Sequence, residues 1–246
     1  MTPVFRIVAL LALWFSASAP VMAQPLTLTA ADKVKVFAEY YGDADKSRPI
    51  VLLFHQASSN AGEYAAIAPR LNALGFNALA LDQRSGGPGW GRDNQTAKAL
   101  RGNAGFEQAL PDLEAALDWA RSDGRTGKVI VWGSSYSASL VFVLAAKHSE
   151  RVAGLLAFSP GEYFGGRSTV RSAAAKVNAP IFVSSASDPG EIAEAKAIID
   201  AAPATLKVQH RPKSGTHGSS SLRADRNPSG ASENWQAVEA FLAKLK

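Results

Sequence analysis

The sequence predicts an α/β fold in which a mostly parallel eight-stranded sheet is covered by helices on both faces. Short runs of apolar and β-branched residues alternate with longer stretches of helical periodicity, which is the pattern of this fold class. The chain has 246 residues, of which 47% are hydrophobic and 19% are charged. This composition supports one sizeable core and excludes a disordered, collagen-like or disulfide-stapled chain. We therefore expect a single globular domain.

Eight runs are predicted to be strands. The first two follow each other without an intervening helix, so we expect them to be antiparallel. The other six are short and apolar, as is typical of strands that are buried on both faces. In chain order, the predicted strands are residues 26–29, 34–40, 50–54, 76–81, 129–132, 152–158, 181–185 and 205–209.

Four helices are predicted from apolar residues that recur every three or four positions. They cover residues 67–74, 110–120, 136–146 and 235–245. The third of these is apolar on nearly every side, which indicates a central buried helix. Pro69 is expected in a first turn or at a kink, because proline disrupts the interior of a helix.

The formal net charge is +5, and there is no cysteine. A modest positive excess in a chain of this length does not resemble a nucleic-acid binder, whose basic residues cluster in a stripe. The lack of cysteine excludes disulfides, thiolate zinc sites and a thiol nucleophile. We expect no nucleic-acid partner, no metal and no cofactor.

Residues 1–23 have the order of a secretory signal peptide. One positive charge precedes a short apolar run at residues 7–15, and small, weakly polar residues follow up to Ala23. The apolar run is too short to span a bilayer comfortably, which disfavours the alternative of an uncleaved anchor. We expect cleavage after Ala23, a mature domain at residues 24–246, and an exported protein, periplasmic or secreted, without stable membrane anchoring.

The sequence GSSYS at residues 133–137 connects a predicted strand directly to a predicted helix. A nucleophile elbow has this arrangement, and it requires small residues two positions before and after the nucleophile. Ser135 meets this requirement, whereas Ser134 would have an aromatic residue at both positions and Ser137 lies further into the helix. We assign Ser135 as the nucleophile; an ordinary serine-rich turn is the alternative.

A nucleophilic serine needs a histidine base, which is oriented in turn by a carboxylate. His217 follows the last predicted strand, in a loop at the carboxyl edge of the sheet, where ligands bind in such folds. The acid is expected between the serine and the histidine in the chain. We assign Asp188, with Glu162 and then Glu191 as alternatives. Asp188 could instead cap the helix that follows it.

The tetrahedral intermediate of acyl transfer needs two hydrogen-bond donors. We expect them to be the backbone N–H of Tyr136, directly after the nucleophile, and that of Gln56, in the loop after the third strand. His55 is expected to shape this loop. Four residues are expected to bind the substrate: His55, Trp90, Glu162 and Tyr163.

These motifs together resemble the α/β-hydrolase superfamily, and in particular its small, capless dienelactone-hydrolase-like and carboxylesterase-like members. The resemblance spans nearly the whole mature chain and rests on His55-Gln56, DQRSGG at residues 82–87, GSSYS at 133–137, Asp188 and THG at 216–218. It implies a Ser-Asp-His triad and an acyl-enzyme intermediate. Dienelactone hydrolases proper commonly use a cysteine nucleophile, and in this respect the chain differs from them.

We expect a serine hydrolase that cleaves small carboxylic esters. Its partner would be a small-molecule ester, and the protein would be a monomer or weak dimer. Only residues 159–179 separate the sixth and seventh strands, which leaves no room for a large lid. A peptidase or amidase on the same triad, or a catalytically silent binding protein with the same fold, are the alternatives.

Overall fold

The computed structural model describes residues 22–102, 104–166 and 168–246, and its centre is a single eight-stranded sheet. The strands are β1 (Gln24–Thr29), β2 (Lys35–Tyr41), β3 (Ile50–Phe54), β4 (Asn77–Leu81), β5 (Val129–Ser134), β6 (Gly154–Phe158), β7 (Ile181–Ser184) and β8 (Lys207–Gln209). Their spatial order is β1-β2-β4-β3-β5-β6-β7-β8. Strand β2 is antiparallel to both of its neighbours, and all other pairs are parallel. The predicted sheet and its antiparallel entry are confirmed.

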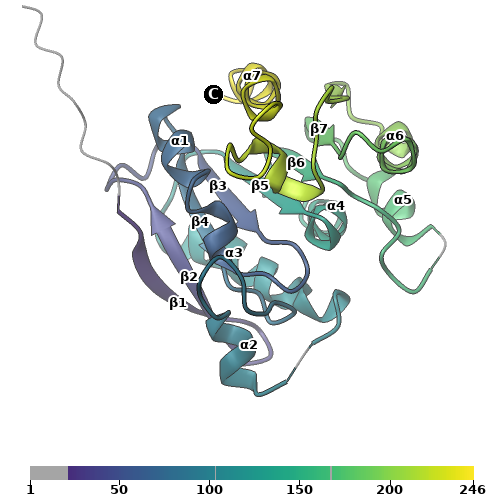
Figure 1. The fold of residues 1–246 in the computed structure, drawn as a ribbon. Coiled ribbons are helices and arrows are strands. Elements are labelled where there is room, and N and C mark those ends of the chain that lie inside the picture. The colour runs from purple at the N-terminus through teal and green to yellow at the C-terminus, as the bar shows by residue number, and fades with distance from the viewer. Residues whose placement is uncertain (1–21, 103, 167) are drawn as a thin grey trace, which may run out of the picture.

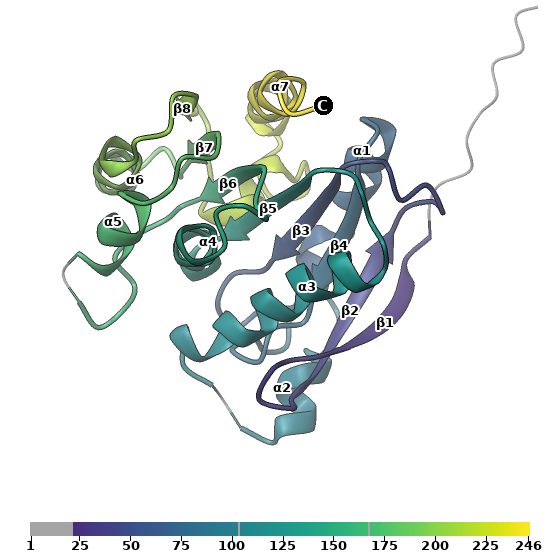
Figure 2. The same ribbon diagram turned by 180° about the vertical axis from the view of Figure 1, so that it is seen from behind.

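Helices cover both faces of the sheet. They are α1 (Ala68–Ala73), α2 (Gln95–Leu100), α3 (Leu110–Ser122), α4 (Tyr136–Lys147), α5 (Thr169–Ala174), α6 (Pro189–Ala201) and α7 (Ala231–Leu242). Helices α1 and α7 pack on one face, and α3, α4, α5 and α6 pack on the other (Figures 1 and 2). Pro69 lies in the first turn of α1, where its missing N–H has no cost.

The core lies on both sides of the central strands, whose side chains are fully buried in β3 and β4. On the α7 side, the ring of Trp132 stacks on Phe158 with centroids 4.7 Å apart, and its Nε1–H donates to Ser219 Oγ at 2.9 Å. On the other side, α4 is buried along most of its length, as its apolar sequence predicts. Burial of this much apolar area is the main stabilising contribution to the fold.

Helices α2 and α5 were not predicted, and α6 was expected only as the helix that Asp188 could cap. Helices α2 and α5 each have only six residues, too few for an apolar stripe to repeat. Helix α5 lies within residues 159–179, between β6 and β7, and the described part of this segment contains no further helix or strand. The domain therefore has no large cap at this position.

The predicted signal peptide lies almost entirely in residues 1–21, outside the described residues, so cleavage and export stay predictions. Within the described ranges, no helix is long and apolar enough to cross a membrane.

The strand register brings several loops together at one edge of the sheet. Phe54 at the end of β3 pairs with Gly133 in β5, and Ser134 at the end of β5 pairs with Phe158 at the end of β6. Phe158 in turn pairs with Ser184, the last residue of β7. Because these parallel strands end together, the loops that follow them converge on one site, as is usual in α/β sheets.

Candidate active site

Ser135 occupies the sharp turn between β5 and α4. Its backbone has φ 58° and ψ −125°, a conformation that residues with a side chain rarely adopt and that is found at functional sites. A Cβ atom on Gly133 would lie 2.2 Å from the carbonyl oxygen of Ser137, so glycine is required there. The Ser135 N–H donates to the Phe158 carbonyl at 2.8 Å, which fixes the turn against β6. This is the geometry of a nucleophile elbow.

The imidazole of His217 lies directly next to the Ser135 hydroxyl. Its Nε2 atom is 2.8 Å from Ser135 Oγ. The next residue, Gly218, has φ +67° and donates its N–H to Ser159 Oγ at 2.9 Å, which ties the histidine loop to the end of β6. The serine and histidine expected from the sequence are thus within hydrogen-bond distance, although they are far apart in the chain.

The carboxylate that contacts His217 is Glu191, and not Asp188 as the sequence analysis expected. Glu191 Oε1 lies 2.8 Å from His217 Nδ1, and Oε2 accepts the Ala186 N–H at 3.0 Å. Asp188 is the N-cap of α6, where its side chain accepts the Glu191 N–H at 3.0 Å. The capping bond directs Asp188 toward the helix, and Glu191 in the first turn reaches the histidine.

Glu162, the other alternative for the acid, is used elsewhere. Its carboxylate accepts the backbone N–H groups of Val170 and Arg171 at 2.8 and 3.0 Å, at the start of α5. It also pairs with the Arg171 guanidinium at 3.2 Å. Glu162 therefore holds α5 in place, and it lines a wide pocket of about 600 Å³ together with Phe164 and Glu194.

Glu191 and His217 each shift the pKa of the other so that its charged form is favoured. The hydrogen bond from His217 lowers the pKa of Glu191 to about 2, with help from the Ser159 hydroxyl and the Ala186 N–H. Glu191 in turn raises the pKa of His217 above its ordinary value, against the opposing effect of burial. With Glu191 ionised, Nδ1 of the neutral imidazole carries the proton and Nε2 accepts from Ser135. This arrangement can activate a serine hydroxyl.

The two expected oxyanion donors differ in availability. Tyr136 begins α4, so its N–H has no partner within the helix. The Gln56 N–H, by contrast, donates to Glu63 Oε2 at 3.0 Å, which corrects the expectation that it is free to bind an oxyanion. The next amide is that of Ala57. The described part of the chain offers no hydrogen-bond acceptor to this N–H.

His55 shapes the loop after β3 from beneath. It is fully buried, and burial lowers its pKa to about 4, so the ring is uncharged at neutral pH. Its Nδ1–H donates to the Gln56 carbonyl at 2.7 Å, and Nε2 accepts the Gln83 N–H at 3.0 Å. The expectation that His55 shapes the loop agrees with these contacts. The expectation that it contacts substrate does not, because the side chain is not accessible.

Trp90 lines a polar pocket beside the loop after β3. The pocket has a volume of about 240 Å³ and is lined by Gln56, Ser58, Ser59, Gly89, Trp90, Ser220 and Arg226. The indole Nε1–H donates to Ser59 Oγ at 2.9 Å. The guanidinium carbons of Arg223 and Arg226 lie 4.2 and 4.8 Å from the centre of a Trp90 ring, within the range of cation–π attraction.

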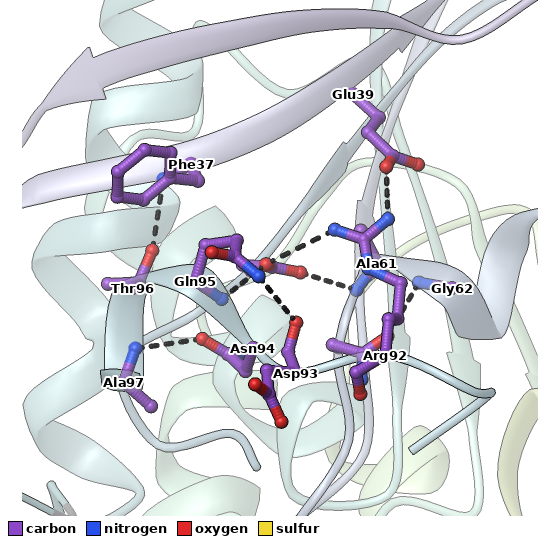
Figure 3. A network of polar contacts seen from close by, with 12 residues as sticks. Phe37, Glu39, Ala61, Gly62, Arg92, Asp93, Asn94, Gln95, Thr96 and Ala97 are labelled. Carbon is purple, nitrogen blue, oxygen red and sulfur yellow. Dashed lines mark hydrogen bonds and ion pairs between the residues drawn. The ribbon is translucent and has the colours of Figure 1, made fainter. Parts of the chain in front are cut away.

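The loop that carries Trp90 is anchored by a polar network (Figure 3). Arg92 forms an ion pair with Glu39 of β2, and its second nitrogen lies 3.4 Å from the buried Asp82. Asn94 caps α2 by accepting the Ala97 N–H at 2.8 Å. These contacts hold the loop against β2 and the end of β4, so the pocket beside Trp90 is largely preformed.

Tyr163 lies close enough to Ser135 for the serine hydroxyl to affect its ionisation. Its hydroxyl donates to the Ser159 carbonyl at 3.1 Å. Burial and the charges of Glu191 and Glu194 raise the pKa of Tyr163 to about 12, and the Ser135 hydroxyl opposes this shift. Tyr163 is therefore a neutral hydrogen-bonding group at the site, consistent with a role in substrate binding.

Histidine and carboxylate side chains do not gather into a metal site in the structure. Among the described residues, no group of three or more could hold a metal ion.

Comparison with known proteins gives the family of the chain. A family model described as serine aminopeptidase S33, named Hydrolase_4, matches residues 45–202. No curated protein sequence matches the chain.

Solved structures with the same fold cover nearly the whole chain. A dienelactone hydrolase from Anabaena variabilis is 16% identical with a TM-score of 0.71, over 92% of this chain and 99% of its own. An esterase from Pyrococcus furiosus is 16% identical with a TM-score of 0.66, over 96% and 95%. A thermostable carboxyl esterase from Bacillus coagulans is 14% identical with a TM-score of 0.69, over 91% and 98%. The chain has the α/β-hydrolase fold and belongs to the Hydrolase_4 family.

Proposed function

We propose that this protein is a serine hydrolase that cleaves small carboxylic esters through an acyl-enzyme. Ser135 is the nucleophile, His217 the general base and acid, and Glu191 the carboxylate that orients the histidine. The observation that carries this proposal is the hydrogen-bonded chain from Ser135 through His217 to Glu191, with 2.8 Å at both steps. Its position on a strained elbow at the carboxyl edge of the sheet supports the same function.

The geometry leads to a two-step mechanism. His217 Nε2 takes the hydroxyl proton as Ser135 Oγ attacks the ester carbonyl carbon, and ionised Glu191 stabilises the imidazolium. The carbonyl oxygen becomes an oxyanion that accepts hydrogen bonds from the N–H groups of Tyr136 and Ala57. The protonated His217 then gives its proton to the leaving alcohol, and the acyl group remains on Ser135.

Water completes the reaction by the same route. His217 takes a proton from a water molecule that attacks the acyl carbon, and a second tetrahedral intermediate forms. Its collapse releases the carboxylic acid and returns the proton to Ser135 Oγ. No group outside the triad, the two amides and water is needed to balance the protons.

Two features favour small esters over peptides. The pocket beside Trp90 has about 240 Å³, and its lining includes Gln56, directly before the Ala57 amide, so we assign a short alcohol or acyl group to it. A peptidase that recognises an amino terminus would need a carboxylate free to bind it. Glu162 is already engaged by the N–H groups of α5. Two of the similar structures are esterases by name.

A panel of chromogenic substrates tests the proposal. We expect p-nitrophenyl acetate and butyrate to be hydrolysed with higher kcat/KM than the palmitate ester, and aminoacyl p-nitroanilides to be poor substrates. Ser135→Ala should abolish the ester activity. Preference for the anilides, or activity that rises steadily with acyl length, would reject small-ester hydrolysis.

A further inference from the structure

Glu63 is a fully buried carboxyl group behind the loop after β3, and the mechanism above does not use it. We propose that Glu63 is a positioning residue of the oxyanion hole: its carboxylate holds the Gln56 N–H and thereby leaves the Ala57 N–H to face the reacting carbonyl. This inference rests on the proposed function, because it assigns a role within the same site.

Glu63 Oε2 is directed to the loop after β3, and the Ser134 hydroxyl of the elbow also favours the ionised carboxyl and lowers its pKa. Oε2 accepts the Gln56 N–H at 3.0 Å and the Ser59 hydroxyl at 3.2 Å. Oε1 is buried without a hydrogen-bond partner among the described residues. A carboxylate that served only to fill space would be costly here, since burial of an incompletely bonded carboxyl group is unfavourable and an apolar side chain would avoid it. Burial raises the pKa of Glu63, because the ionised carboxylate is less stable away from water.

The turn that carries Glu63 is itself rigidly held. Asp82 accepts the Ala61 N–H at 2.8 Å, and the Asn60 side chain accepts the Gly62 N–H at 2.9 Å (Figure 3). The Arg223 guanidinium donates to the Glu63 carbonyl at 3.0 Å. The carboxylate therefore reaches the loop from a fixed platform, which is what a positioning group requires.

Two contacts fix the two peptide planes on either side of Gln56. Glu63 holds its N–H, and the His55 Nδ1–H holds its carbonyl at 2.7 Å. Because the peptide bond is planar and trans, the Ala57 N–H points away from the carbonyl that His55 holds. Rotation of either plane would move this amide out of alignment.

The constrained loop lies against the nucleophile elbow. Phe54, the last residue of β3, pairs with Gly133, two residues before the nucleophile. The Ser137 hydroxyl, in the first turn of α4, donates to the His55 carbonyl at 2.6 Å. The amides after His55 therefore lie on the same side of the sheet edge as the Tyr136 N–H, as an oxyanion hole requires.

Three variants separate positioning from folding. Glu63→Gln keeps a carbonyl oxygen for the Gln56 N–H, and its kcat should stay within about threefold of the wild type. Glu63→Ala removes the acceptor and should lower kcat by about tenfold or more, with KM within about twofold, since oxyanion donors act in the transition state. Glu63→Asp keeps the carboxyl group but withdraws the oxygen from the Gln56 N–H, so it should show the same loss of kcat, and it replaces the alanine variant if the latter does not fold.

The measurements are kcat and KM for p-nitrophenyl acetate, with hydrogen exchange of the amides at residues 56–59. We expect faster exchange of the Gln56 amide in Glu63→Ala and Glu63→Asp but not in Glu63→Gln. An alanine or aspartate variant with wild-type kcat would overturn the inference, as would a loss that appears only in KM. A wild-type enzyme without esterase activity would instead reject the proposed function, and the role of Glu63 with it.

Discussion

His217 Nδ1 lies 2.8 Å from Glu191 Oε1, while Asp188, three residues earlier in the chain, caps the same helix. We predict that Glu191→Gln lowers kcat by about 100-fold to 10,000-fold, because an amide stabilises neither the required tautomer nor the imidazolium. Asp188→Asn keeps a capping oxygen and should retain most of the activity. The steady-state rates of the two variants on p-nitrophenyl acetate check this prediction. Comparable losses in both variants would contradict the assignment of Glu191.

The pH dependence of kcat/KM should reflect the contact between Glu191 and His217. Glu191 raises the pKa of His217 above its ordinary value of 6.5, and catalysis needs the neutral imidazole. The acid limb of kcat/KM should therefore have its midpoint above 6.5 in the wild type and move to lower pH in Glu191→Gln. A profile measured from pH 4 to 9 decides this, and an acid limb that does not move would disagree with the Glu191–His217 contact.

His55 should make stability depend on pH. Burial lowers its pKa to about 4 in the folded state, so only the unfolded chain binds its proton between about pH 6.5 and 4. Its contribution to the unfolding free energy is complete above pH 6.5 and falls on acidification, by at most about 1.4 kcal/mol per pH unit. Urea unfolding should show this slope as the difference between the wild type and His55→Asn. An equal slope in the wild type and His55→Asn would show that His55 is not the group responsible.

Gly218 is required by both its backbone and its surroundings. It has φ +67°, and a Cβ atom would lie 2.4 Å from Ser134 Oγ. We expect Gly218→Ala to destabilise the protein by about 2 kcal/mol or more and to lower kcat, because the strain displaces the adjacent His217. Thermal unfolding and ester hydrolysis measure the two effects.

Gly91→Ala separates backbone strain from crowding as the cause of the expected loss at Gly218. Gly91 has φ +74°, and a Cβ atom there would have no other atom within 4 Å, so alanine meets only the backbone penalty of about 1 kcal/mol. Activity should be nearly unchanged. If Gly91→Ala were as damaging as Gly218→Ala, crowding against Ser134 would not be the reason.

The strands were predicted well because fully buried strands such as Ile50–Phe54 are continuous apolar runs, and burial is what the sequence pattern reports. The structure brings together Ser135 and His217, which were predicted from their local patterns, an elbow and a loop after the last strand. Helices α2 and α5 are too short to produce a periodicity.

The structure places Glu191, and not the predicted Asp188, against His217, and the reason is local. Asp188 and Glu191 lie in one turn at the same edge of the sheet, and chain order does not distinguish them. The pattern Asp-Pro-Gly-Glu does contain a signal, since an aspartate before Pro189 is a typical N-cap and is then used by the helix. Glu63 had no such signal, because its role depends on the loop that folds over it.

We propose that Ser135 is a nucleophile activated by His217 and Glu191. Labelling with a fluorophosphonate probe, followed by mass spectrometry of the peptides, tests this role most directly. We predict a single label on Ser135 in the wild type, none in Ser135→Ala, and much slower labelling in His217→Ala and Glu191→Gln. An unlabelled wild-type protein, or a label that persists in Ser135→Ala, would contradict the account.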